Sequence, residues 1–137
     1  MADCIFCKIV KKEIPSSTVY ENKNVLAFLD IYPVNKGHVL IIPKKHYETL
    51  TDIPDELLAD VMKATKKVAK AVMKAMKTDG FNVGMNNYKA AGQLVPHAHF
   101  HIIPRFNEDG LKLWPQGSYQ EGEMKPIAEA IKKNISE

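Results

Sequence analysis

The chain has 137 residues, an apolar content of 45% and a formal net charge of +3. This length excludes two enzyme lobes, and the weak positive charge gives no reason to expect nucleic acid as a partner. No apolar run approaches the roughly 18 residues that span a bilayer, and the first residues lack the basic and apolar regions of a signal peptide. We expect a single cytoplasmic domain over residues 1–137, with no nucleic-acid or membrane partner.

The first part of the chain predicts a short helix or turn and then three strands. Residues 4–12 carry apolar side chains at mixed spacing, which favours the helix or turn. A short polar turn separates residues 19–21 from 25–30, so these two segments predict a hairpin. Residues 38–42 predict a third strand, which ends at Pro43.

The longest pattern is an amphipathic helix that begins at Pro54 and Asp55. Lysines cover one face, which is typical of a solvated helix surface, and Gly80 is expected as the C-terminal cap. We expect the apolar stripe to pack on a sheet; it consists of Leu57, Leu58, Val61, Met62, Val68, Ala69, Val72 and Met76.

The second half predicts two more strands and a last helix. Residues 81–86 alternate as a strand does, and residues 97–103 form an apolar and histidine strand that ends at Pro104. Strands joined by short connections and covered by one long helix predict an α+β fold with an antiparallel sheet. The C-terminal helix carries apolar residues at helical spacing: Ile127, Ala128, Ile131 and Ile135.

Three histidines, His97, His99 and His101, alternate with apolar residues in the last predicted strand. On a regular strand their imidazoles leave one face about 6.6 Å apart, close enough to hold a metal ion or a phosphate. Burying three unpartnered imidazoles costs more than burying apolar residues, so the cluster predicts a function. Neutral imidazole can attack phosphorus when a hydrogen bond to its other nitrogen fixes the tautomer.

Cys4 and Cys7 have the Cys-x-x-Cys spacing of a zinc site or a redox dithiol. In a reducing compartment this pair favours metal or redox chemistry over a structural disulfide. Two unrelated buried cysteines remain the third interpretation. A zinc knuckle needs two further ligands.

The histidine pattern of residues 97–103 resembles the histidine triad (HIT) family, named for histidines that alternate with apolar residues. The resemblance extends to residues 37–44, to Asp30, to Asn86 and to the Gly-Gln pair at 92–93. It implies a HIT-like fold with an antiparallel sheet, a homodimer, and a hydrolase or transferase that acts on the α-phosphate of a purine nucleotide.

The resemblance also implies catalytic roles. His99 matches the nucleophile, His101 the residue beside the phosphate and leaving group, and His38 a supporting histidine. Asn86 and Gln93 match the side chains that bind the α-phosphate and the bridging oxygen. Asp30 matches the carboxylate that holds the ribose hydroxyls. The base pocket would be lined by apolar residues for which plain core packing is the alternative: Ile5, Phe6, Ile9, Phe28, Ile31 and Leu40.

Many microbial members of that family hold a structural zinc, and its ligand positions are all filled here: Cys4, Cys7, His46 and His97. Four protein ligands leave no open position for a catalytic water, so this zinc is expected to be structural. His97 would then face the metal while His99 and His101 face the phosphate. The chain must therefore bend, or begin its strand, near Pro96.

Leu94 departs from the family pattern, in which a serine or threonine after the Gly-Gln pair helps to bind phosphate. Trp114 is expected as a lid, a dimer contact or a residue that closes the core. The leading hypothesis is a hydrolase that cleaves nucleoside phosphoramidates through a covalent nucleotidyl-His99 intermediate. The alternatives are a dinucleoside polyphosphate hydrolase, a non-catalytic nucleotide-binding module and a hydrolase with catalytic zinc.

Overall fold

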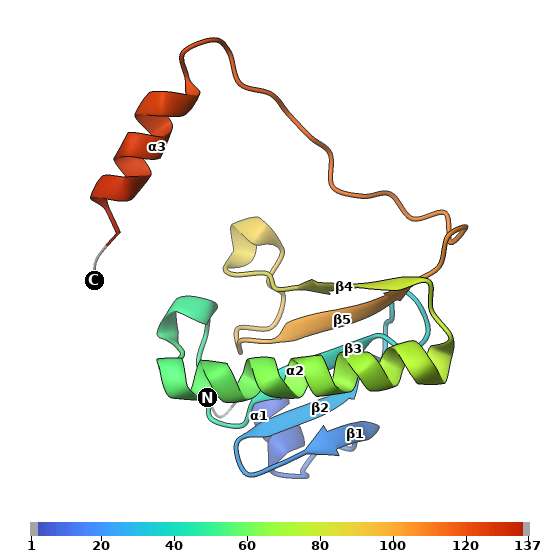
Figure 1. Ribbon diagram of the computed structural model, residues 1–137. Coiled ribbons are helices and arrows are strands. Elements are labelled where there is room, and N and C mark those ends of the chain that lie inside the picture. Colours follow the sequence, from blue (N-terminus) through green and yellow to red (C-terminus); the bar gives the residue numbers. More distant parts are fainter. Residues whose placement is uncertain (1–2, 136–137) are drawn as a thin grey trace.

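The computed structural model describes residues 3–135, so both ends of the predicted domain lie outside the described residues. Its strands form one antiparallel sheet in the order β1-β2-β3-β5-β4, with the long helix α2 across one face (Figure 1). This arrangement confirms the predicted α+β fold. The strands are β1 (Thr18–Glu21), β2 (Val25–Leu29), β3 (Val39–Pro43), β4 (Gly80–Gly84) and β5 (Phe100–Arg105).

Helix α2 (Asp55–Met76) covers the sheet with the apolar stripe that its sequence predicts. Its buried residues are Val61, Ala64, Thr65, Val68, Ala69 and Val72. Two expectations were wrong. Met62 is 41% exposed, because a residue next to Val61 is turned about 100° away from it on a helix. Gly80 is not the cap: Lys77 adopts the left-handed conformation (φ 52°) that ends the helix, and Gly80 begins β4.

The opposite face of the sheet is shared between a short helix and the histidines. Helix α1 (Ile5–Val10) places Phe6 and Ile9 against the β2 and β3 side chains of this face. Leu40 of β3 belongs to this cluster and lies opposite His101 of β5, so His101 points to the same side as α1. The helix thus builds one wall beside the histidines.

The two histidine strands begin later than predicted, and each includes the proline that was expected to end it. The third strand begins at Val39, which leaves His38 just before it, and the last strand begins at Phe100. Residues 95–97 form a bend, so His97 does not share a strand face with His101. The expected bend near Pro96 is confirmed.

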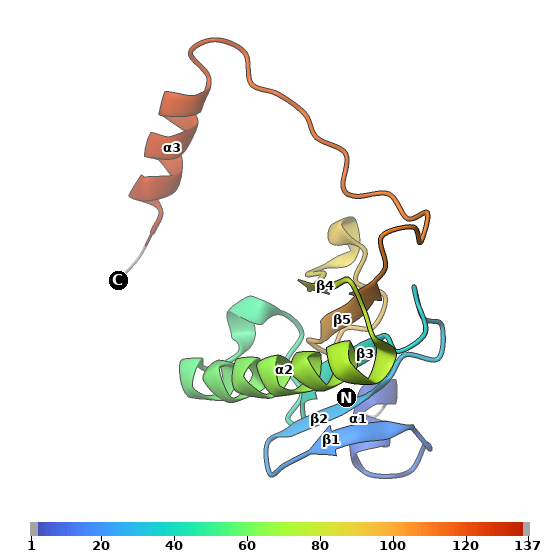
Figure 2. The ribbon, with the colours of Figure 1, turned by 45° about the vertical axis from the view of Figure 1, so that its right-hand side comes forward.

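The C-terminal part of the chain leaves the sheet. Residues 111–123 form no helix or strand, and they lead to helix α3 (Met124–Lys133), which stands apart from the rest of the molecule (Figures 1 and 2). Ile127 and Ile131 on α3 are 42% and 60% exposed, and none of its residues is buried. Among residues 3–135, no helix has the length and apolar content to cross a membrane.

Candidate active site and metal centre

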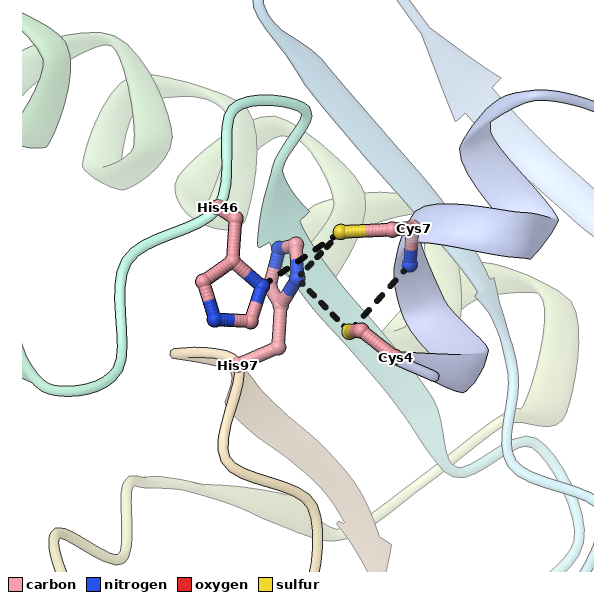
Figure 3. Close-up of side chains that lie close together, drawn as sticks. All are labelled: Cys4, Cys7, His46 and His97. Atoms are coloured by element: carbon pink, nitrogen blue, oxygen red, sulfur yellow. Dashed lines mark hydrogen bonds between the residues drawn. The ribbon is translucent and has the colours of Figure 1, made fainter. Parts of the chain in front are cut away.

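Four side chains from distant parts of the sequence meet at the start of α1, and Figure 3 shows the sulfurs of Cys4 and Cys7 facing the rings of His46 and His97. Cys4 Sγ and Cys7 Sγ lie 3.4 and 3.6 Å from His97 Nδ1, and Cys7 Sγ lies 3.4 Å from His46 Nδ1. Tetrahedral zinc, bound at about 2.3 Å by sulfur and 2.0–2.1 Å by nitrogen, would hold these atoms about 3.5 Å apart. The spacing and the donor set therefore fit zinc.

Hydrogen bonds orient the metal-type donors. His97 Nε2 lies 2.8 Å from the carbonyl oxygen of Pro43, which can only accept, so Nε2 holds the proton and Nδ1 turns its lone pair toward the sulfurs. His97 is fully buried. Burial is the main cause that raises the pKa of the Cys7 thiol, and the hydrogen bond to Cys4 raises it further. A metal that binds thiolate would therefore release a proton here.

His99 is held in the tautomer that a nucleophile needs. Its Nδ1 donates to the carbonyl oxygen of His97 at 2.7 Å, which leaves the lone pair on Nε2. The residue is 6% exposed, and its ring forms a T-shaped contact with the Phe6 ring, with the ring centroids 5.1 Å apart. Burial lowers the pKa of His99, so its imidazole is neutral near pH 7.

His101 is prepared as a neutral hydrogen-bond donor. The main-chain N–H of Val34 donates to His38 Nδ1 at 3.0 Å, so the His38 proton lies on Nε2. That proton is donated to His101 Nδ1 at 2.9 Å, which leaves the His101 proton on Nε2. The pKa of His101 is lowered to about 4, mainly by burial and then by electrostatic repulsion from the rings of His99 and His38. Asp30 Oδ2 stands 3.7 Å from His38 Nε2.

The residues predicted for the base pocket divide into two groups. The buried ones pack together where α1 meets the sheet: Phe6, Ile9, Phe28 and Leu40. Ile5 is 45% exposed and Ile31 is 79% exposed. The structure therefore gathers the first group into a core cluster beside His99 and leaves the second at the surface.

Gln93 uses both ends of its amide on the main chain. Its Oε1 accepts from the N–H of Tyr88 and its Nε2 donates to the carbonyl oxygen of Glu48, each at 2.7 Å. The side chain thus braces the loop in which Tyr88 takes an unusual positive φ of 69°. Leu94, at 92% exposed, lines a surface hollow with Cys4, whereas His38 and His101 line a different one.

Another hollow, of about 520 Å³, opens beside His38 and His101. His38, His101 and Asn86 line it, together with the chain segment around Trp114. Trp114 is 87% exposed, so it does not close the core.

Sequence reasoning missed three main-chain groups: the N–H of Val34 and the carbonyl oxygens of Pro43 and His97. They set the tautomers of His38, His97 and His99. No residue type signals such a contact, because almost every residue carries the same main-chain groups.

Comparisons with known proteins found a family model, curated relatives and solved structures that match most of this chain. The model of the HIT domain family matches residues 11–108. Adenosine 5'-monophosphoramidase hnt1 of Schizosaccharomyces pombe is 45% identical over 134 residues, which cover 96% of this chain and 98% of the relative. The crystal structure of a HIT family member from Bacillus subtilis is 41% identical with a TM-score of 0.92, covering 98% of this chain and 99% of that one. A Zn-bound histidine triad family protein from Mycobacterium smegmatis is 39% identical with a TM-score of 0.77, covering 85% of each chain.

Proposed function

This chain belongs to the HIT domain family, and from that membership and the tautomer of His99 we propose that it cleaves nucleoside phosphoramidates at the α-phosphate. The S. pombe relative bears the name of a monophosphoramidase, which supports a hydrolase that acts on nucleotides. The observation that carries the proposal is the hydrogen bond from His99 Nδ1 to the His97 carbonyl, because it leaves a nucleophilic Nε2 beside the neutral donor His101.

The reaction follows from these two tautomers. His99 Nε2 attacks the α-phosphorus while the bond from phosphorus to the leaving nitrogen breaks. The nitrogen, protonated in the bound substrate, departs with the electron pair as a neutral amine. His101 donates a hydrogen bond from Nε2 to the phosphate oxygens as negative charge grows on them.

Hydrolysis of the covalent intermediate completes the cycle. Water attacks the phosphorus, the bond to His99 Nε2 breaks, and its electron pair returns to the ring. The proton of the water passes to solvent, and the product is the nucleoside monophosphate. His99 regains its starting tautomer because Nδ1 keeps its proton throughout and donates it to the His97 carbonyl oxygen.

Three further side chains receive proposed roles around this centre. We propose that Asp30, which stands beside His38, binds the ribose hydroxyls. Asn86, which lines the hollow with His101, is proposed to bind the α-phosphate. Gln93 is proposed to act through the loop that it braces, since both ends of its amide already bond to the main chain. Its direct contact with phosphate stays a prediction of the family resemblance.

We propose that the cluster of Cys4, Cys7, His46 and His97 holds a structural zinc. The spacing of its donor atoms supports this, as does the Zn-bound relative from M. smegmatis. Bound zinc would tie the start of α1 to His97, whose carbonyl orients His99. A catalytic zinc shared by the three triad histidines is disfavoured. Nδ1 of His99 and Nδ1 of His101 are already hydrogen bonded to other groups, and neither of them faces His97 Nδ1.

We also propose a homodimer. Helix α3 carries Ile127 and Ile131 toward solvent, and no described part of the chain covers them. A second copy would bury this face. Sedimentation of the full chain should give a dimer, and replacing both residues with glutamate should shift it toward monomer; a wild-type monomer would contradict the proposal.

The reaction is tested by single turnover with an α-labelled adenosine phosphoramidate and, in parallel, a dinucleoside polyphosphate. Wild-type protein should trap label and release it to water, while His99→Ala should trap none. Equal turnover by the two proteins would remove His99 as the nucleophile. Trapping from the polyphosphate alone would favour the alternative hydrolase.

A further inference from the structure

An apolar groove lies between α2 and the β1 edge of the sheet, on the face opposite His101. Figures 1 and 2 show β1 and β2 extending past α2 on this side. The groove has a volume of about 240 Å³. Among the described residues, Lys67 is the only charged side chain that lines it. Its two walls come from α2 and from the first two strands: Ala71, Ala75 and Met76, and Val19, Tyr20 and Leu29.

The groove is open because α2 carries small side chains where it faces β1. Ala71 and Ala75 lie about one turn apart on this side of the helix, and both are exposed. Val19 and Leu29 on the opposite wall are exposed as well. Small-molecule sites usually enclose roughly 300–1,000 Å³, so this smaller apolar groove suits the side chains of a protein partner better than a cofactor.

A row of lysines on α2 borders the groove. Lys67 lines the groove itself, and its Nζ lies 5.3 Å from the centre of the Tyr20 ring. Lys63, Lys70 and Lys74 follow the helical spacing of Lys67, so the four extend along one side of α2 for about 16 Å. Within residues 3–135, none of these four lysines forms a salt bridge.

This lysine row is unfavourable for the helix that carries it. Like charges three or four residues apart repel each other, as Lys63 and Lys67 do. Only Lys74 lies in the last turn, where the helix dipole favours a cation. Soluble helix faces normally mix both signs of charge, whereas residues 61–78 contain six lysines and no acidic residue. The missing carboxylates are therefore expected from a partner.

The possible occupants differ in how well they match both the groove and the row. Helix α3 of a second copy is a poor match, because it carries Lys125, Lys132 and Lys133 against the single acidic residue Glu129. A nucleic-acid backbone or an anionic membrane would neutralise the lysines but leave the apolar groove beside them unfilled. A protein segment with acidic and apolar side chains matches both features.

We propose that the groove and its lysine row bind an acidic segment of a protein partner. Large apolar side chains of that segment fill the groove between α2 and β1. Aspartate or glutamate side chains next to them face the row: Lys63, Lys67, Lys70 and Lys74. The histidines lie on the other face of the sheet, so this interface is independent of the proposed hydrolase activity.

The probe is a library of random linear peptides displayed on phage and selected on the full-length protein. Enriched peptides should combine Asp or Glu with Leu, Phe or Trp, and a synthetic copy should bind more weakly as salt rises. Lys67→Glu combined with Lys74→Glu should weaken its binding by about tenfold. Ala71→Phe fills the groove from an exposed position and should also weaken it. The matched control is Lys66→Glu with Lys77→Glu, which changes the net charge equally, away from the groove, and should keep the wild-type affinity.

The other outcomes overturn the proposal. It falls if no acidic peptide is enriched, or if the groove-side pair and the control pair weaken binding equally. It also falls if Ala71→Phe leaves peptide binding unchanged while single-stranded DNA or phosphatidylserine vesicles bind through Lys67 and Lys74, because the row would then serve a polyanion. If Ala71→Phe converts a dimer to a monomer in sedimentation, a second copy covers the groove instead. Melting temperatures close to the wild-type value would show that the variants are folded.

Discussion

Two groups of histidines lie close together in this fold, and each brings ligand-type atoms within 4.8 Å of one another, yet their ring nitrogens are used in opposite ways. In the cysteine-containing group, the rings of His46 and His97 meet at 84° and both Nδ1 atoms face sulfur. In the other, His38 Nε2 and His101 Nδ1 face each other at 2.9 Å, shorter than the roughly 3.3 Å that two nitrogens on one tetrahedral zinc require. The first spacing suits a metal and the second suits a proton.

The difference arises from what the outer nitrogen of each ring contacts. A main-chain acceptor, the Pro43 carbonyl, takes the proton of His97 and frees its inner nitrogen for a metal. A main-chain donor, the Val34 N–H, occupies the outer nitrogen of His38 and forces the proton to the inner one. One main-chain contact therefore decides whether the inner nitrogen of the ring carries the lone pair that a metal ligand needs or a proton that it can donate.

The largest expected effect separates chemistry from metal binding. His99→Ala removes the proposed nucleophile and should lower kcat/KM for an adenosine phosphoramidate by about 10⁴-fold or more, since nucleophile removal has costs of this order. Zinc content should stay at the wild-type level, because His99 is not among the four metal-type side chains. Rate assays combined with metal analysis would check both. Wild-type turnover by the variant would contradict the assignment.

Cys4→Ser should produce the opposite pattern. Loss of one thiolate should abolish stoichiometric zinc and lower the melting temperature by about 10 °C, because metal binding contributes directly to folding. Activity below the melting range should fall far less than in His99→Ala. Thermal unfolding and metal analysis, with and without a chelator, would measure this. A variant that keeps a full equivalent of zinc would contradict the proposed centre.

A smaller effect is expected from the hydrogen bond between His38 and His101. His38→Ala removes the donor that keeps the His101 proton on Nε2, and kcat should fall by about 10²-fold. His38→Gln offers an amide N–H in place of Nε2 and should recover part of the rate. Zinc content should not change in either variant. Nitrogen NMR of His101 should show the proton on Nε2 in wild type and in His38→Gln, and a mixture of tautomers in His38→Ala.

Side-chain periodicity predicted the larger elements of the fold well. The apolar stripe of α2 and the alternation in the strands depend on many residues, so no single contact can overturn them. The prediction of where α2 ends was wrong because Lys77, and not a glycine, takes the left-handed conformation. The cysteine and histidine group was foreseen because four residues of two types that zinc prefers, cysteine and histidine, occupy the family positions.

The finer arrangement of the site lay beyond the sequence. A regular strand would place His97, His99 and His101 on one face, and the bend at residues 95–97 is what turns His97 toward the cysteines. The second contact of each ring is a main-chain group, which the sequence does not mark. Gln93 shows the same effect, since its amide braces a loop through the main chain of Tyr88, five residues away, and of Glu48, 45 residues away.

The smallest expected effect concerns acid stability. Burial, followed by His99 and His38, lowers the pKa of His101 to about 4, compared with about 6.5 for an unperturbed histidine. The pKa of His101 is lower in the folded protein than in the unfolded one, so the neutral ring stabilises the fold. This stabilisation is complete above about pH 6.5 and is lost as the pH falls toward 4. His101→Asn keeps an acceptor for His38 but no titrating ring, so between about pH 7 and pH 5 it should lose about 1 kcal/mol less stability than wild type, after allowance for solvent access. Urea unfolding of the zinc-loaded proteins measures this difference, and the proton-linked loss of the metal centre cancels because both proteins contain it. Equal losses would mean that His101 does not carry the low pKa, and the contrast between a metal group and a proton group would lose its electrostatic support.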